Sequence, residues 1–406
     1  MTLEMKKIGD FVSLRQGLAI NKGTAHLVSD NKTENYIYPL LRIADMLDGS
    51  FHKYISRNVQ PSVIARPEDI IYTRTGQIGL AFRGFNGCVH NNSFIVSLES
   101  NEITKDYLFV ILQSDFVRSQ ALSMAKNSVQ PDLTHGMFKN IVIPIPDLEN
   151  QKKIVDIYLQ LVNKIRLNSK IIETSKKLMR EIYDYWFVQF DFPDENCRPY
   201  KSSGGEMVYD EKLKREIPKE WKAIDLSNLV KNRTEATIGT HDDKCIDLSI
   251  MPSDNIVLDK YNFGDSFSSN MKTMKKGDIL FGSIRPYLRK AGIAPYDGVR
   301  AGTVHCFYAK NTIDSSMCSV MMTSEDMFQY AIMKSGGSTR MPSVSAKDIL
   351  SYSFAYNQEI SSKYNDICSD LINQIILLIN ENISLAYLRD WLLPMLMNGQ
   401  VKIEDK

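Results

Sequence analysis

Two long segments of the chain carry a seam of mostly apolar residues that advances by alternating steps of four and three positions. The first seam occupies positions 154, 158, 161, 165, 168, 172, 175, 179, 182 and 186, and the second 360, 364, 367, 371, 374, 378, 381, 385, 388 and 392. Either segment alone fits an amphipathic helix buried on an unrelated core. A 3.5-residue spacing sustained in both, with polar breaks at the fifth and seventh positions of each seam, favours a coiled coil.

The matching polar breaks predict that the two helices pair antiparallel within one chain. Asn168 would then lie near Glu381, and Ser175 near Gln374. Buried polar groups are costly unless they satisfy one another, and their best-attested use is to fix helix alignment. A helix over 154–186 would be about 50 Å long, more than the roughly 34 Å of one DNA turn. Two domains joined by such helices could read two patches of one duplex.

The segments that precede the two helices repeat one another. Residues 66–76 match 276–285, since each has a turn, an acidic residue, a buried strand and a polar end that bears arginine. Residues 128–134 match 339–345, and Asn150-Gln151 match Asn357-Gln358 where each helix begins. Internal repetition indicates a duplicated architecture. The predicted fold class is α+β, with two mixed α/β domains separated by two long helices that form an antiparallel coiled coil.

Turn and capping signals divide the chain into five parts. Pro144-Ile-Pro146 ends the first domain, Asp147 is a favourable N-cap residue, and Gly399 is a favourable C-cap residue. The predicted parts are 1–146 for the first domain, 147–190 for the first helix, 191–217 for a turn-rich linker, 218–356 for the second domain and 357–399 for the second helix.

Composition adds limits rather than a function. A hydrophobic content of 43% and a charged content of 24% over 406 residues fit two or three globular domains. The net charge of +1 neither indicates nor excludes a nucleic-acid partner, because a local basic patch is invisible in a total. The N-terminus does not resemble a signal peptide, and the six cysteines are scattered. We therefore expect a cytoplasmic protein with reduced thiols, no structural zinc and no membrane partner.

Motifs for intrinsic catalysis are missing from the sequence. There is no phosphate-binding P-loop, no Gly-x-Gly-x-x-Gly, no Asn-Pro-Pro-aromatic tetrapeptide and no Gly-x-Ser-x-Gly. The acidic stretch 146–152 could suggest a nuclease, but its place at a helix start makes N-capping the better explanation. Single, isolated histidines do not indicate a metal site. For His90 and His305, a DNA contact and a core hydrogen bond both stay open.

What remains is a set of polar, arginine-bearing segments that occurs in both domains. Arginine binds guanine edges, asparagine and glutamine bind adenine, and serine and threonine bind bases or phosphates. These segments therefore predict DNA contacts, with solvated loops as the alternative for any single residue. The candidates in the first domain are Arg74, Thr75, Gln77, Arg83, Asn91, Asn92, Lys126, Asn127, Ser128 and Gln130. Those in the second domain are Ser283, Arg285, Arg289, Lys290, Arg300, Thr303, His305, Ser338, Thr339 and Arg340.

Five short segments accompany the duplicated arrangement of domain and helix. They are Asn150-Gln-Lys-Lys-Ile154, Tyr185-Trp-Phe187, Ile217-Pro-Lys-Glu-Trp221, Gly277-Asp-Ile-Leu280 and Trp391-Leu-Leu-Pro-Met-Leu-Met-Asn-Gly399. In their order and duplication, the chain resembles the specificity subunits of type I restriction-modification systems over essentially its whole length. Two departures are Pro394 within the last helical turns and Ser353-Phe-Ala-Tyr356, which lacks the Ile-Pro-Ile-Pro ending of the first domain.

The resemblance implies a subunit that catalyses nothing and recognises double-stranded DNA. Each domain would read one half of a bipartite, asymmetric site, while the helices set the spacer and dock two methyltransferase subunits. Those partners would use S-adenosylmethionine to methylate adenine, and motor-nuclease subunits would bring ATP and magnesium chemistry. The alternatives are part of a fused restriction-methylation enzyme and a coiled-coil scaffold without a DNA role. The resemblance does not imply which bases are read, because DNA shape adds to loop contacts.

Overall fold

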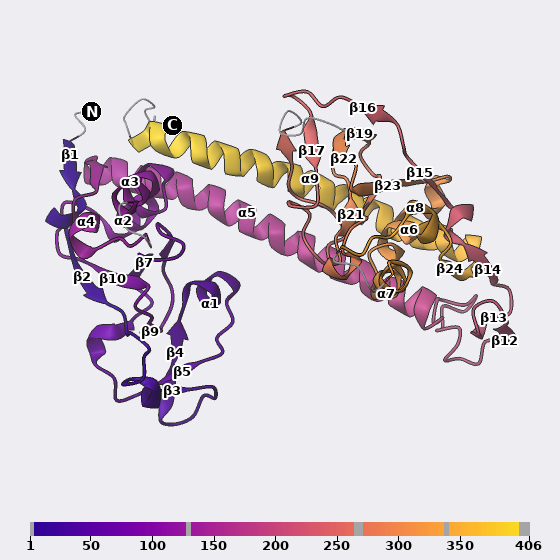
Figure 1. The fold of residues 1–406 in the computed structure, drawn as a ribbon, viewed down its shortest axis with the longest axis horizontal. Coiled ribbons are helices and arrows are strands. Elements are labelled where there is room, and N and C mark those ends of the chain that lie inside the picture. Colours follow the sequence, from indigo (N-terminus) through magenta and orange to yellow (C-terminus); the bar gives the residue numbers. More distant parts are fainter. Residues whose placement is uncertain (1–3, 127–130, 264–270, 337–340, 398–406) are drawn as a thin grey trace. The chain divides into compact units, whose positions relative to one another are not determined.

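The computed structural model describes residues 4–126, 131–263, 271–336 and 341–397 (Figure 1). The chain divides into two compact units, one formed by Met1–Lys164 with Leu385–Lys406 and the other by Ile165–Ser384. Each unit therefore contains one sheet-rich module together with a segment of each long helix. The predicted C-cap residue Gly399 lies outside the described residues.

The module of unit 1 is built on three sheets. Their strand orders are β2-β10-β7-β8, β3-β5-β4-β9-β6 and β1-β11. The strands are β1 (Glu4–Lys7), β2 (Val12–Gln16), β3 (Val28–Ser29), β4 (Tyr36–Leu41), β5 (Tyr54–Ser56), β6 (Ile64–Ala65), β7 (Ile70–Thr73), β8 (Ala81–Phe82), β9 (Gly87–Val89), β10 (Ser93–Leu98) and β11 (Val142–Ile145). The helices are α1 (Ile43–Asp48), α2 (Lys105–Leu112), α3 (Asp115–Ala125) and α4 (His135–Lys139).

The four-stranded sheet of unit 1 is covered on both faces. Ile70 and Tyr72 of β7 pack in one hydrophobic core with residues of α2, α3 and α4. Ile71, between them, belongs to a second core with Leu41 and Val89 of the five-stranded sheet. Because successive side chains of a strand point to opposite faces, a strand buried on both sides becomes a continuous apolar run.

The module of unit 2 repeats this plan. Its sheets have the orders β15-β23-β20-β21, β16-β19-β22-β17-β18 and β14-β24, with an added hairpin β12-β13. The strands are β12 (Met207–Asp210), β13 (Arg215–Pro218), β14 (Lys222–Asp225), β15 (Val230–Asn232), β16 (Ala236–Thr237), β17 (Lys244–Ile246), β18 (Asn262–Phe263), β19 (Met271–Met274), β20 (Ile279–Gly282), β21 (Ala291–Ile293), β22 (Gly298–Ala301), β23 (Val304–Ala309) and β24 (Ser353–Tyr356). The short helices are α6 (Ser315–Met321), α7 (Glu325–Lys334) and α8 (Ala346–Leu350).

The main strand pairings and the helix caps recur in both modules. The central strand β10 pairs antiparallel with β2 and β7, as β23 does with β15 and β20. A parallel pair also recurs, β4 with β9 and β17 with β22. Ser114 and Ser324 cap α3 and α7, and Thr134 and Ser345 cap α4 and α8, each by accepting a backbone N–H. The predicted duplication is therefore confirmed.

The two predicted long helices are present. Helix α5 spans Leu148–Tyr183 and continues into a π-helical turn, Asp184–Val188, and helix α9 spans Gln358–Met397. Asp147 caps α5 as expected, because its carboxylate accepts the backbone N–H of Asn150 at 2.8 Å.

Within each unit the helix segments pack antiparallel. In unit 1, Ile154 and Tyr158 of α5 share a core with Leu393 and Leu396 of α9. In unit 2, the hydroxyl of Tyr364 donates to the carbonyl of Met179 at 2.8 Å, and the Tyr364 ring meets those of Trp186 and Phe187. The predicted antiparallel pairing is confirmed.

One of the two predicted polar pairs forms. The Asn168 amide is 1% exposed and donates to the Glu381 carboxylate at 2.7 Å and to the Asn382 side chain at 3.0 Å. Ser175 is buried, but Gln374 is exposed, and within the described part of the chain no hydrogen bond joins them. The prediction of the second pair was wrong.

The buried face of α9 also departs from the predicted seam. Ile367 and Leu388, both on that seam, are 43% and 40% exposed, whereas Cys368, Ile375 and Ile379 are buried. A straight α-helix advances 3.6 residues per turn, so its buried face drifts away from a strict 3.5-residue repeat. The buried residues of α9 therefore recur with the 3.6-residue period of a straight helix.

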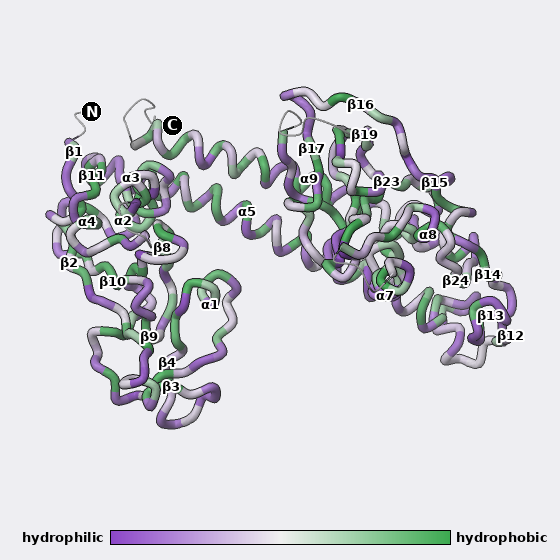
Figure 2. The backbone as a smooth tube through the Cα atoms, in the orientation of Figure 1, coloured by the Kyte–Doolittle hydropathy of each residue, from purple (hydrophilic) through white to green (hydrophobic). Residues whose placement is uncertain are grey.

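Helix α9 is, by length and composition alone, apolar enough over Gln358–Leu396 to cross a membrane, a test that core helices also pass. Ile375 and Ile379 are buried in the core of unit 2, and Asn373 and Gln374, which directly precede Ile375, are exposed. Figure 2 shows hydrophobic and hydrophilic positions interleaved along both α5 and α9. Because amides are costly in hydrocarbon, we assign this apolar face to packing within the protein.

We expect Asn168 and Glu381 to be energetically coupled. Asn168→Ala should lower the free energy of unfolding by about 1–2 kcal/mol, because it leaves a partly buried carboxylate short of a donor. A double-mutant cycle with Glu381→Ala, followed by urea unfolding of the full chain, should give a coupling of at least about 0.5 kcal/mol. Thr174→Ala, at an exposed position of the same helix, serves as control. Additive effects of the two changes would contradict the pairing.

Candidate DNA interface

Three connections of the first module meet beyond one end of its four-stranded sheet. They are the β7–β8 loop (74–80), the β9–β10 turn (90–92) and the segment before α4 (131–134). The backbone N–H of Arg74 donates to the carbonyl of Asn92 at 2.8 Å, and the N–H of Leu133 donates to the carbonyl of Arg74 at 3.0 Å. Thr75 forms an antiparallel bridge with Asp132.

The second module closes the same junction with different residues. The N–H of Ser283 donates to the carbonyl of Thr303 at 3.0 Å, and the N–H of Val344 donates to the carbonyl of Ser283 at 2.9 Å. Ile284 bridges Ser343. Ser283 thus takes the place of Arg74, Thr303 that of Asn92, and Val344 that of Leu133. We call each junction a three-loop corner, with residues 283–290, 302–303 and 341–344 forming that of unit 2.

Ten of the sequence-predicted site residues come together at these corners, although they are far apart in the sequence. Gln77, Arg285 and Thr303 are exposed, and the other seven are partly buried. In unit 1 the ten include Arg74, Thr75, Gln77, Asn91 and Asn92, and in unit 2 Ser283, Arg285, Arg289, Lys290 and Thr303.

Two predicted arginines of the first module are engaged within it. Arg74 forms an ion pair with Asp132 at 2.5 Å and donates to the carbonyl of Leu133 at 3.3 Å, which holds the corner together. Arg83 lies outside the corner, where it pairs with Asp106 on α2 and stacks over the Phe109 ring. Their charges are partly neutralised before any ligand arrives.

Two predicted cations of the second module also form hydrogen bonds to backbone carbonyls within that module. Arg300 is 2% exposed, and its guanidinium donates to the carbonyls of Val304 and Arg233. Lys290 donates to the carbonyl of Leu248. These placements turn both side chains toward the interior of the module and away from the surface of the corner.

The two histidines near the corners, His305 and His90, are uncharged and form hydrogen bonds within their own modules. The Nε2 of His305 lies 2.9 Å from the carbonyl of Val344, which is the core hydrogen bond left open by the sequence. Burial lowers the pKa of His305, and it lowers that of His90, whose Nδ1 accepts the N–H of Asn92 at 3.4 Å. Near neutral pH neither ring carries a charge that would attract phosphate.

Six predicted residues lie outside the described part of the chain, and one lies beside it. Lys126 is exposed at the C-terminal end of α3. The six are Asn127, Ser128, Gln130, Ser338, Thr339 and Arg340.

The sequence analysis missed a pair of ionic clamps, one mostly buried in unit 2 and one partly buried in unit 1. In unit 2, Asp278 accepts from Arg233 at 2.6 and 3.2 Å, and in unit 1, Asp69 accepts from Arg15 at 3.1 Å. Both aspartates directly precede the central buried strands β7 and β20 and tie them to the first strand of the sheet. Burial, reinforced by Asp278, raises the pKa of the Cys306 thiol to about 12, so the thiol stays protonated and donates to Asp278. The sequence signal that could have revealed the clamps is the aspartate, Asp69 or Asp278, that precedes the buried strand in each of the two matched segments.

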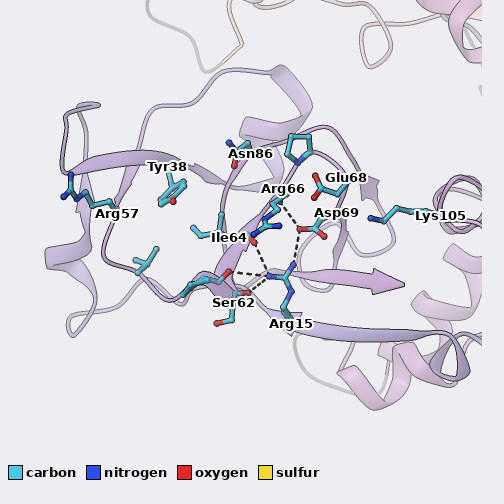
Figure 3. A pocket seen from close by; sticks show the side chains of 13 residues that line it. Arg15, Tyr38, Arg57, Ser62, Ile64, Arg66, Glu68, Asp69, Asn86 and Lys105 are labelled. Carbon is cyan, nitrogen blue, oxygen red and sulfur yellow. Dashed lines mark hydrogen bonds and ion pairs between the residues drawn. The ribbon is translucent and has the colours of Figure 1, made fainter. Parts of the chain in front are cut away.

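The clamp of unit 1 stands at a cavity of about 810 Å³ (Figure 3). Its lining includes Arg57, Arg66 and Lys105 beside the Arg15–Asp69 pair. Figure 3 shows Asp69 receiving hydrogen bonds from Arg15 and from Arg66, the latter through its backbone N–H at 2.9 Å. The cavity is built on β2, β6 and the turn before β7, so it is a separate feature from the three-loop corner.

Among the described residues, no group of three or more histidine, cysteine or acidic side chains could hold a metal ion. All six cysteines are free, five of them buried. The structure therefore combines duplicated modules, each with a three-loop corner, and two long helices whose segments pack antiparallel within each unit.

Comparison with known proteins agrees with the resemblance seen in the sequence. Residues 2–176 match the family model described as type I restriction modification DNA specificity domain. The chain is 23% identical over 359 residues to the type I restriction enzyme MjaIX specificity subunit of Methanocaldococcus jannaschii, covering 83% of this chain and 78% of that protein. It is 28% identical over 228 residues to the MjaVIII specificity subunit of the same organism, covering 56% of this chain and 49% of that protein. The chain is thus similar, over most of its length, to type I restriction enzyme specificity subunits.

A solved structure shares the fold. The type I restriction-modification S subunit from M. genitalium is similar with a TM-score of 0.61 and 14% identity, over 100% of this chain and 97% of that one. At 14% identity this likeness shows the shared fold. The predicted family and fold class are confirmed, and neither a fused enzyme nor a scaffold without a DNA role is favoured.

Proposed function

We propose that each module reads one half of a bipartite, asymmetric DNA site through its three-loop corner. The observation that carries this proposal is that one backbone junction recurs in both modules with different side chains. Ser283 and Thr303 stand where Arg74 and Asn92 stand in the first module. The same backbone hydrogen bonds with different polar side chains suit two modules that recognise different DNA sequences, because the side chains that contact base edges determine which sequence is recognised.

The long helices set the spacer between the half-sites and dock two methyltransferase subunits. Exposed apolar side chains on α5 support a protein partner, since Leu167, Ile171 and Leu178 are 55%, 43% and 44% exposed. On α9, Leu377 and Tyr387 are 66% and 73% exposed. Large exposed apolar groups on a helix suit a partner that covers them.

The catalytic chemistry belongs to the partners in this proposal. The chain itself needs no cofactor, the methyltransferase subunits use S-adenosylmethionine, and motor-nuclease subunits use ATP and magnesium for restriction. The complex works in the cytoplasm, where genomic DNA is accessible and thiols stay reduced. The buried, unpaired cysteines of both modules fit such a compartment.

The test is a methylated-adenine map of cells that express the chain with its methyltransferase partner. We expect one bipartite, non-palindromic motif, with two short specified halves around an unspecified spacer. Cells that express the methyltransferase alone are the control and should lack that motif. A continuous or palindromic motif, or a map that does not depend on the chain, would contradict the proposal.

A further inference from the structure

The sheet-end loops of the two corners share two backbone positions of unusual conformation. The loops have the same closing hydrogen bonds, from Thr73 N–H to the carbonyl of Leu80 at 2.9 Å and from Gly282 N–H to that of Lys290 at 2.8 Å. In unit 1 the left-handed positions are Gly76 and Gly79, with φ of 74° and 93°. In unit 2 they are Arg285 and Arg289, with φ of 52° and 56°.

Equivalent positions therefore carry glycine in one module and arginine in the other. Gly76 is the third residue after Thr73, as Arg285 is after Gly282, and Gly79 and Arg289 each precede the closing residue. Glycine adopts a positive φ without a steric penalty, whereas an arginine Cβ is crowded by the following carbonyl. Each arginine holds a conformation that glycine would take more easily, so other interactions of the residue offset the cost.

For Arg289 the offset lies inside the protein. Its guanidinium pairs with Asp254 at 2.5 Å and with Glu325, and it stacks over the Phe328 ring with 5.6 Å to the ring centroid. The equivalent position in the first module is closed to a side chain, because a Cβ on Gly79 would lie 2.7 Å from Cγ of Arg118. Arg289 is thus a structural arginine.

For Arg285 the backbone alone is held, and no side-chain interaction with the described residues adds to it. Its backbone N–H donates to the carbonyl of Pro342 at 2.7 Å, which anchors the loop. Its side chain is exposed and, among the described residues, has neither a hydrogen bond nor an ion pair. Thr303, another exposed residue of this corner, belongs to the turn that closes it.

We infer that Arg285 is the specificity-determining residue of the second module and reads a guanine in its half-site. This inference rests on the proposed function, in which the three-loop corner meets base edges. The guanidinium is a planar fork of donors that matches O6 and N7 of guanine in the major groove. In the first module the glycine at the same place adds no side chain and lets the backbone approach DNA closely.

The test uses the full chain bound to its methyltransferase partner and a pool of randomised duplex DNA. Arg285→Gly should lower discrimination at one guanine of the second half-site by about ten- to hundred-fold. The melting temperature should be unchanged or higher, because glycine relieves the backbone strain. The preference in the first half-site should be unchanged, which makes it an internal control for assembly.

Arg285→Lys separates base reading from charge attraction. Lysine keeps the positive charge but loses the bidentate fork, so we expect most of the discrimination to be lost with it. A loss of affinity that is equal for all sequences, or unchanged discrimination in Arg285→Gly, would overturn the inference. If the unmodified complex selected no bipartite motif, the proposed function itself would have failed, which is a distinct result.

Discussion

Exchanging residues 1–145 for the first module of another specificity subunit is expected to change one half of the methylated site and to leave the other half and the spacer unaltered. The exchange replaces the three-loop corner of unit 1 and keeps both long helices. Each mismatched base pair costs about 1–3 kcal/mol, so the old half-site, with several altered pairs, should lose recognition by three orders of magnitude or more. Methylated-adenine mapping of the two strains measures the result.

The reciprocal exchange of residues 222–356 is the matched control, because it replaces the other corner and should alter the other half only. The outcome that counts against modular reading is a change of both halves by either exchange. Loss of all methylation would instead indicate failed packing. Ile143 shares a core with Ile154 and Tyr158 of α5, so a donor module with similar side chains at that contact should be chosen.

The second large effect is expected from Asp278→Ala. Asp278 and Arg233 have side chains only 4% and 12% exposed, and the carboxylate also accepts the backbone N–H of Lys275 at 2.9 Å. Its removal leaves a mostly buried guanidinium without its counter-charge, which typically costs about 3–5 kcal/mol. Urea unfolding of the full chain should show a loss of this size.

Asp69→Ala is the control, because it removes the same clamp from the first module. The Arg15 and Asp69 side chains are 31% and 13% exposed, and Arg15 also donates to the carbonyl of Ile64 at 3.2 Å. Solvent and this second acceptor should limit the loss to about 1–2 kcal/mol. Equal losses for the two variants would show that burial does not set the strength of the clamp.

Sequence pattern predicted the duplication, the two helices and one polar pair, because each rests on local periodicity or on short matched segments. It gave the start of the second helix correctly, at Asn357, but aligned the two helix starts incorrectly. Asp147 and Asn357 both accept the N–H three residues on, so they are the equivalent caps. The sequence match had paired Asn150 with Asn357 because both are followed by glutamine. Asn150, however, lies three residues after the cap of its helix, whereas Asn357 is itself the cap.

The site was predicted by residue type, and residue type does not reveal where a side chain points. Arg285, Arg289 and Arg300 are alike in the sequence, yet one is exposed, one is paired with two carboxylates and one is buried. Those differences arise from partners that are distant in the sequence, Asp254 and Glu325 for Arg289 and the carbonyl of Arg233 for Arg300. The glycine–arginine equivalence likewise appears only when backbone hydrogen bonds align the two loops.

The shared core of unit 1 imposes an order on folding during synthesis. Ile154 and Tyr158 of α5 are buried with Leu393 and Leu396, which follow the whole second module. At translation rates of about 5–20 residues per second, the apolar side chains Ile154 and Tyr158 of α5 are made about 12 to 50 seconds before Leu393 and Leu396, which cover them. The module that is synthesised first is therefore the last to complete its core. Until then the apolar side chains Ile154 and Tyr158 are uncovered, and we expect a chaperone to bind there.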